Sequence, residues 1–68
     1  MSHAQLKELG RVIHRERAKA KLTQRDLAEK AGVSHPTILH LERGDFKRPD
    51  SEKLLRIAHA LNLNAADF

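Results

Sequence analysis

The sequence predicts an all-α protein, a compact bundle of short helices around one small core. Apolar residues recur three and four positions apart along most of the 68-residue chain, as they do on one face of a helix. The strict alternation of apolar and polar residues that marks a half-buried strand is absent. There is no cysteine, so neither disulfides nor a cysteine-based zinc site can reinforce the fold, and packing must hold it. We expect one domain over residues 1–68.

The first helix is predicted over about residues 4–20. Leu6, Leu9 and Ile13 fall on one stripe of this helix together with Ala20, and most of the other positions are charged. A stripe of this kind predicts one face against the core and one in water.

The second helix is predicted to begin after Thr23. Thr23 stands three positions before Asp26, and a hydroxyl followed by an acid at this distance is typical of a capping box. The apolar side of this helix consists of Leu27, Ala28 and Ala31. We expect the helix to end before Gly32, because glycine adopts the left-handed conformation that closes helices with negligible strain.

A third helix is predicted over about residues 35–43. Ser34 is suited to cap it, and Pro36 falls in its first turn, where a missing N–H costs nothing. Ile38 and Leu41 are expected to face inward, and Gly44 to end the helix.

The fourth helix is predicted to start at Asp50 or Ser51, and Asn62 is a plausible left-handed stop. It has the densest apolar stripe of the chain, made of Leu54, Leu55, Ile57, Ala58 and Leu61. Asn64 can cap a last turn over residues 65–68, which is too short to be stable alone, so Phe68 must dock on another surface.

The break between the second and third helices is itself informative. Two helices joined by about three residues cross closely at a large angle, which needs a small residue at the crossing and a glycine at the turn, here Ala28 and Gly32. Val33, Ile38 and Leu41 then fix the third helix and leave its outward face free of packing. This arrangement, over about residues 23–43, is a helix-turn-helix, which projects one helix for insertion into a DNA major groove.

Two stretches carry a resemblance to a known family. The segments LTQRDLAEKAGVSHPTILHLERG and KRPDSEKLLRIAHALNL resemble the lambda-repressor/Cro-like (XRE-type) DNA-binding domain of bacterial and phage regulators. The resemblance implies a bundle of about five helices that binds double-stranded DNA sequence-specifically, often as a homodimer on a two-fold operator. It further implies a transcriptional regulator, more often a repressor, in the cytoplasm and at the nucleoid when bound.

The expected DNA contacts fall on the start of the second helix, on the outward face of the third, and on the loop after it. In the family, a glutamine matching Gln24 contacts a phosphate and supports the recognition helix, and the loop follows the DNA backbone. The expected DNA-binding residues are Thr23, Gln24, Ser34, His35, Pro36, Thr37, His40, Arg43, Lys47 and Arg48.

The resemblance also assigns structural roles. Arg17 is expected to pair with Glu42, as the matching positions do in the family, and so to fix the recognition helix to the body. Leu63 and Phe68 are expected to contribute to the dimer interface.

The composition favours some classes of partner and excludes others. The net charge of +4 suits a polyanionic partner, and with two phenylalanines and no other aromatic residue the stacking platforms used on single strands are scarce. Neither a membrane span nor the apolar core of a signal peptide is present in the pattern. His35 and His40 lie about 140° apart around a helix, without the spacing of metal ligands, so we expect no metal and no cofactor. No motif of an enzyme is present.

Three alternatives stay open. The chain could be the DNA-binding antitoxin of a toxin–antitoxin pair, with a toxin as partner. It could be a piece of a longer protein with a C-terminal sensing domain. It could also be a protein-interaction module that kept the fold without DNA binding, for which Pro36 and Leu39 on the outward face are the only hints. The operator, any effector and the sign of regulation are not encoded in a readable way.

Overall fold

The computed structural model describes residues 3–45 and 50–63. It contains four α-helices in these ranges and no strand among the described residues. The helices are α1 (His3–Lys19), α2 (Gln24–Ala31), α3 (His35–Arg43) and α4 (Ser51–Ala60). Their bounds lie within a residue or so of those predicted from the sequence. The further turn expected over residues 65–68 falls outside the described part of the chain.

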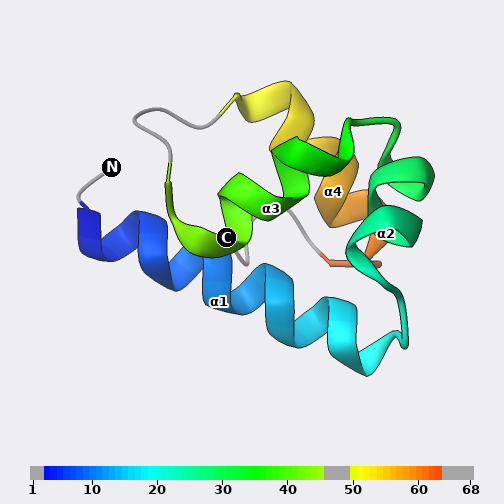
Figure 1. The fold of residues 1–68 in the computed structure, drawn as a ribbon, viewed down its shortest axis with the longest axis horizontal. Helices are drawn as coiled ribbons and strands as arrows, with labels where there is room; N and C mark the ends of the chain where they lie inside the picture. The colour runs from blue at the N-terminus through cyan, green and yellow to red at the C-terminus, as the bar shows by residue number, and fades with distance from the viewer. Residues whose placement is uncertain (1–2, 46–49, 64–68) are drawn as a thin grey trace.

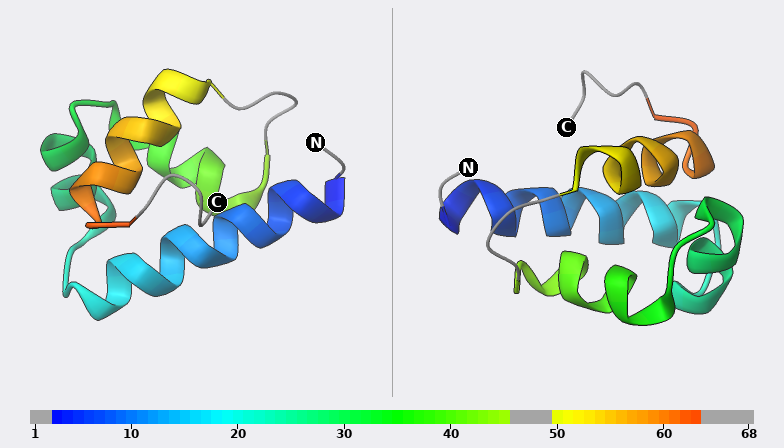
Figure 2. Two further views of the ribbon diagram at one scale, coloured as in Figure 1. Left: turned by 180° about the vertical axis from the view of Figure 1, so that it is seen from behind. Right: turned by 90° about the horizontal axis from the view of Figure 1, so that it is seen from above.

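The four helices pack in a chain of contacts. α1 packs on α3, α3 on α2, and α2 on α4. Figure 1 shows α1 running beneath α3, with α2 at the end of the molecule where α1 finishes. In the view from above, on the right of Figure 2, α3 and α4 lie on opposite sides of α1. None of the other three described helices therefore lies against one long side of α3.

The core lies between the four helices and contains the apolar residues expected from their periodicity. Ile13, Leu27, Ile38 and Ile57 are its largest fully buried side chains, one from each helix. Leu22, Val33, Leu54 and Leu63 pack against it from its edge.

Two residues of the expected apolar stripes are exposed instead. Leu55 is 44% exposed, because it lies about 100° around α4 from Leu54 and so falls at the margin of the buried face. Ala20 follows the end of α1, in the turn that leads to α2, and is exposed.

A close approach of two helices fixes α1 against the end of α3. A Cβ placed on Gly10 would lie 2.5 Å from the carbonyl oxygen of Leu41 and 2.6 Å from that of Glu42. Real side chains do not make such contacts with backbone atoms, so this crossing requires glycine.

The turn between α1 and α2 contains a strained position. Lys21 has a φ of 59°, in the left-handed region that few non-glycine residues adopt. Its amide donates to the carbonyl of Ala18, and the amide of Leu22 donates to that of Arg17. Asn62, the stop expected after α4, also has a positive φ, of 58°.

None of the helices described here is long and apolar enough to cross a membrane.

Candidate nucleic-acid interface

α2 begins with the capping box expected from the sequence. The Thr23 side chain accepts from the backbone N–H of Asp26, and the Asp26 carboxylate accepts from that of Thr23, both at 3.0 Å. These hydrogen bonds hold the pKa of Asp26 below its usual value of 3.8. The first turn of α2 is therefore fixed in place, with Gln24 as its first residue.

The turn between α2 and α3 is closed by Gly32 in the left-handed conformation, with a φ of 72°. Its amide donates to Glu29, and the amide of Val33 donates to Ala28, the two bonds of a Schellman motif. A Cβ on Gly32 would meet no atom within 4 Å. Gly32 is thus required by the backbone conformation and not by lack of space, whereas the buried Ala28 provides the small side chain near the turn.

α3 starts from a similar cap. The Ser34 side chain accepts from the backbone N–H of Thr37, and the hydroxyls of the two residues lie 2.8 Å apart. Pro36 occupies the first turn, and Gly44 ends the helix with a φ of 73°. Both ends of this nine-residue helix are therefore set by local sequence.

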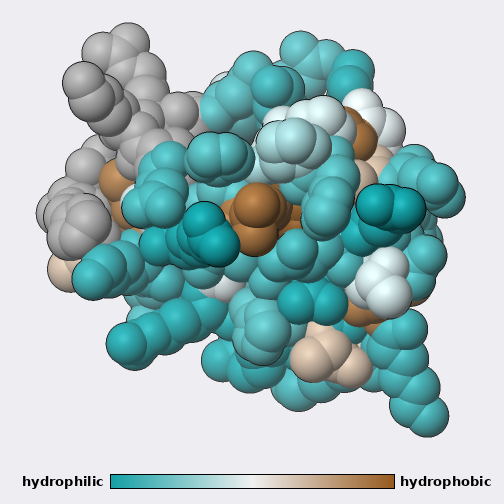
Figure 3. Space-filling model, in the orientation of Figure 1, coloured by the Kyte–Doolittle hydropathy of each residue, from teal (hydrophilic) through white to brown (hydrophobic). Residues whose placement is uncertain are grey.

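The two faces of α3 differ in what covers them. Ile38 and Leu41 are buried in the core, whereas Pro36, His40 and Arg43 are exposed. The half-buried residues of α3 are His35, Thr37, Leu39 and Glu42. Figure 3 shows the face that carries α3, which is mostly hydrophilic with one apolar patch near its middle, over α3. An exposed polar helix face of this kind is free to contact another molecule.

An ion pair ties α3 to α1, as expected from the resemblance. Arg17 donates through Nε to Oε2 of Glu42 at 2.7 Å and through Nη2 to Oε1 at 3.0 Å. The two side chains are only 13% and 6% exposed. Nη1 of Arg17 also donates to the carbonyl of Leu22, at 2.9 Å. One guanidinium therefore holds the end of α3 and the turn before α2 together.

Glu42 is the centre of a wider polar cluster. Its Oε1 lies 3.0 Å from Nδ1 of His14 and accepts from Nε2 of Gln24 at 3.3 Å. Burial, the largest influence, raises the pKa of Glu42, but the hydrogen bonds from Arg17, His14 and Gln24 and the charge of Arg17 lower it more. The net effect holds this pKa below 4.5, so Glu42 is a carboxylate at neutral pH.

Gln24 links this cluster to the start of α3. Its Oε1 lies 3.2 Å from Nε2 of His35. The resemblance implied that Gln24 supports the recognition helix, but its contact with His35 was not predicted, because sequence spacing does not show that two side chains eleven residues apart will meet. His14 is 63% exposed yet reaches Glu42.

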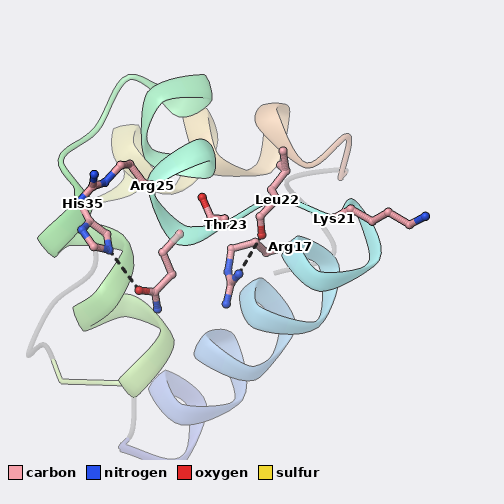
Figure 4. A pocket seen from close by; sticks show the side chains of 7 residues that line it. Arg17, Lys21, Leu22, Thr23, Arg25 and His35 are labelled. Carbon is pink, nitrogen blue, oxygen red and sulfur yellow. Dashed lines mark hydrogen bonds between the residues drawn. The ribbon is translucent and has the colours of Figure 1, made fainter.

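A shallow hollow of about 590 Å³ opens where the turn before α2 meets the start of α3. Figure 4 shows its lining side chains, with the hydrogen bonds from His35 to Gln24 and from Arg17 to Leu22. The lining residues are Arg17, Lys21, Leu22, Thr23, Gln24, Arg25 and His35. None is an acid, and although Arg17 is paired with Glu42, Lys21 and Arg25 have no ion-pair partner among the described residues, so the hollow favours an anion.

Cations near α3 differ from those of α1 in their pairing. On α1, Arg11 pairs with Glu8, and Arg15 and Lys19 both pair with Glu16. By contrast, Lys21, Arg25 and Arg43 have no carboxylate within ion-pair distance in the ranges 3–45 and 50–63. Lys30 of α2, Lys7 of α1 and Lys53 of α4 lack such a partner as well, so four of these six described cations lie on or beside α2 and α3.

Some expected site residues cannot be placed. Lys47, Arg48 and Phe68 lie outside the described residues. Leu63 is half-buried and packs against the core, so only part of its side chain is available to a partner. Among the residues that the structure describes, no three histidines, cysteines or acids gather in a way that could hold a metal ion.

Comparison with known proteins gives matches to the sequence and to the fold. A family model described as helix-turn-helix matches residues 13–68. Two curated relatives, from two strains of Mycobacterium tuberculosis, are named uncharacterized HTH-type transcriptional regulators, MT0491 and Rv0474. Each is 39% identical over 56 residues, which cover 82% of this chain and 39% of the relative. The chain thus spans well under half the length of these relatives.

Two solved structures share the fold. The restriction-modification controller protein C.AhdI from Aeromonas hydrophila has a TM-score of 0.87 and 25% identity, over 94% of this chain and 96% of its own. The clp gene regulator ClgR from Corynebacterium glutamicum has a TM-score of 0.82 and 39% identity, over 91% of this chain and 65% of its own.

Proposed function

The chain belongs to the helix-turn-helix family, and from this premise we propose that it binds double-stranded DNA sequence-specifically and regulates transcription by occupying an operator. α3 is the recognition helix. One observation carries the proposal: α3 is held at both ends and on its inner side, while none of the helices in residues 3–45 and 50–63 lies against its outward face. The relatives are named as regulators and controllers, which supports the same role.

The expected contacts with DNA are of two kinds, those to the phosphate backbone and those to the base edges in the major groove. Thr23 and Gln24, at the amino end of α2, and Ser34, at that of α3, present N–H groups and polar side chains to phosphates. Arg43, with Lys47 and Arg48 of the following loop, adds charge along the backbone. The residues that reach base edges are His35, Pro36, Thr37 and His40.

We further propose that the protein acts as a homodimer on a two-fold site. Its contact is built from the end of α4 and the residues that follow it, including Leu63 and Phe68. Half-sites about one helical turn apart follow from such symmetry. Its place of action is the bacterial cytoplasm, at the chromosome, and the bacterial sources of the relatives support this.

Selection of bound sequences from a random duplex library tests the function. We expect one enriched sequence with dyad symmetry, which then binds in a gel shift more tightly than random duplex at the same salt concentration. Retention of no duplex, or of all duplexes equally, would contradict sequence-specific binding. Enrichment of a site without a dyad or repeat would contradict the dimer alone.

A further inference from the structure

The orientation of the Gln24 amide is set by its neighbour. Glu42 is a carboxylate, which only accepts hydrogen bonds, and its Oε1 lies 3.3 Å from Nε2 of Gln24. The reverse orientation of the amide would place two oxygens against each other. Oε1 of Gln24 therefore points to His35, at the start of α3.

This orientation determines where His35 carries its proton. Nε2 of His35 lies 3.2 Å from Oε1 of Gln24, and an amide oxygen only accepts. Nε2 must therefore bear the hydrogen. In neutral imidazole Nδ1 is then an acceptor, and it has no hydrogen-bond partner among the described residues. His35 is half-buried, so part of its side chain is accessible to a partner.

We propose that Gln24 is a positioning residue that holds His35 in its Nε2–H tautomer, so that His35 reads a base edge as a hydrogen-bond acceptor through Nδ1. This rests on the proposed function. In the major groove, adenine and cytosine present an exocyclic amine, whereas guanine and thymine present carbonyl oxygens. Neutral His35 therefore selects adenine or cytosine at the position it contacts. The other tautomer would donate through Nδ1 to an acceptor, which guanine, thymine and also adenine through its N7 present, and so would not require an amine.

His40 provides an internal contrast. Neither of its ring nitrogens has a hydrogen-bond partner in the described part of the chain, so nothing there selects its tautomer. It can donate to one base and accept from another. The strict choice of an amine-bearing base is thus a property of His35 and not of every histidine on α3.

Charges around His35 decide the conditions of the test. Arg17 and Lys21, from the end of α1 and the turn after it, and Arg25 of α2 line the same hollow. Glu42 and His14 lie beyond Gln24. Protonation would place a hydrogen on both ring nitrogens of His35 and remove the acceptor. Measurements are therefore made at about pH 8, above the usual titration range of imidazole.

The tautomer is measured first, by the ¹⁵N chemical shifts of the imidazole rings in the DNA-free protein. In the wild type we expect Nε2 of His35 to be protonated and Nδ1 to be bare. Gln24→Met keeps the length of the side chain and removes the hydrogen bond, so both tautomers should then be populated. The exposed Glu29→Met on the same helix is the control and should leave His35 unchanged. A bare Nε2 in the wild type, or no change in Gln24→Met, overturns the proposal.

Base preference is measured next, by library selection with the same three proteins. Wild type and Glu29→Met should prefer adenine or cytosine at one position by at least about fivefold, the value of a good base contact. In Gln24→Met this preference should fall to near unity, while preferences at other positions persist. A preference for guanine or thymine at the affected position overturns the reading by Nδ1. If the wild type retains no duplex, the proposed function fails, and the ring shifts still decide the tautomer.

Discussion

Arg17 of α1 donates two hydrogen bonds, of 2.7 and 3.0 Å, to the carboxylate of Glu42 on α3, and both side chains are nearly buried. The rest of the Arg17 guanidinium donates to Leu22, so it has partners on the turn before α2 as well. Because this pair joins the body of the protein to the helix that we propose reads DNA, its loss should affect both stability and recognition.

Replacing Arg17 tests the energetic weight of this pair. Glu42 is 6% exposed in the wild type, and Arg17→Ala removes its charged partner, which should cost about 3 kcal/mol or more in the free energy of unfolding, measured by urea denaturation. Arg56→Ala is the matched control, because Arg56 pairs with Glu52 on the surface of α4. There the loss should be no more than about 1 kcal/mol. Equal losses in the two variants would contradict a buried pair.

Glu42 should also make the free energy of unfolding depend on pH in the acidic range. Its pKa is lowered in the folded state, so its contribution is fully present above the usual value of 4.5 and is lost as the pH falls through the folded-state value. The wild type should therefore exceed Glu42→Gln in unfolding free energy at pH 7, and the two should converge below pH 4.5. The pKa of Asp26 is also lowered, but Asp26 is present in both proteins, so its contribution cancels in the difference between them. A constant difference across this range would show that the charge of Glu42 is not the cause.

For Gly10→Ala, the sign of the change in the free energy of unfolding tests the contact between α1 and α3. In an ordinary helix interior alanine is favoured over glycine by about 1 kcal/mol. Here the added methyl group would meet two carbonyl oxygens of α3 at 2.5 and 2.6 Å, which cannot move without separating α1 from α3. We therefore expect a loss of about 2 kcal/mol in unfolding free energy. Stabilisation would mean that the helices are not in this contact.

Lys21→Gly should act in the opposite direction. Lys21 has a φ of 59°, and glycine there relieves a strain of about 1 kcal/mol, so the melting temperature should rise. Asn62→Gly is the control: its φ is 58°, but asparagine tolerates the left-handed region better and should gain less. If Lys21 also contacts a phosphate, Lys21→Gly will bind duplex more weakly despite its stability. A gain no larger than that of Asn62→Gly would argue against strain at Lys21.

Local signals in the sequence were enough to predict the helices but not the contacts between their polar side chains. The ends of α2 and α3 follow from Thr23, Gly32 and Ser34, whose effects reach only a few residues. Leu55 was misassigned because a residue at the margin of an apolar stripe is buried or exposed according to what packs beside it. The link from Glu42 through Gln24 to His35 depends on the crossing of three helices, which spacing alone does not give.

The division between reading bases and holding the backbone can be tested with one residue of each kind. Lys47→Ala removes an expected phosphate contact, so binding to all duplexes should weaken similarly and the salt dependence should flatten by about one unit. Which bases are preferred should not change. The measurement is the affinity for the selected site and for random duplex at several salt concentrations.

His40→Ala should behave differently, because His40 is exposed on the outward face of α3, where a side chain can reach a base edge. A contact of this kind discriminates between bases, so its loss should cost about 1 to 3 kcal/mol at the selected site and little on random duplex. The slope of affinity against salt should stay nearly constant. If His40→Ala kept the full preference while Lys47→Ala altered which bases are selected, α3 would not be the reading element, since the residues that specify would then lie in the loop after it.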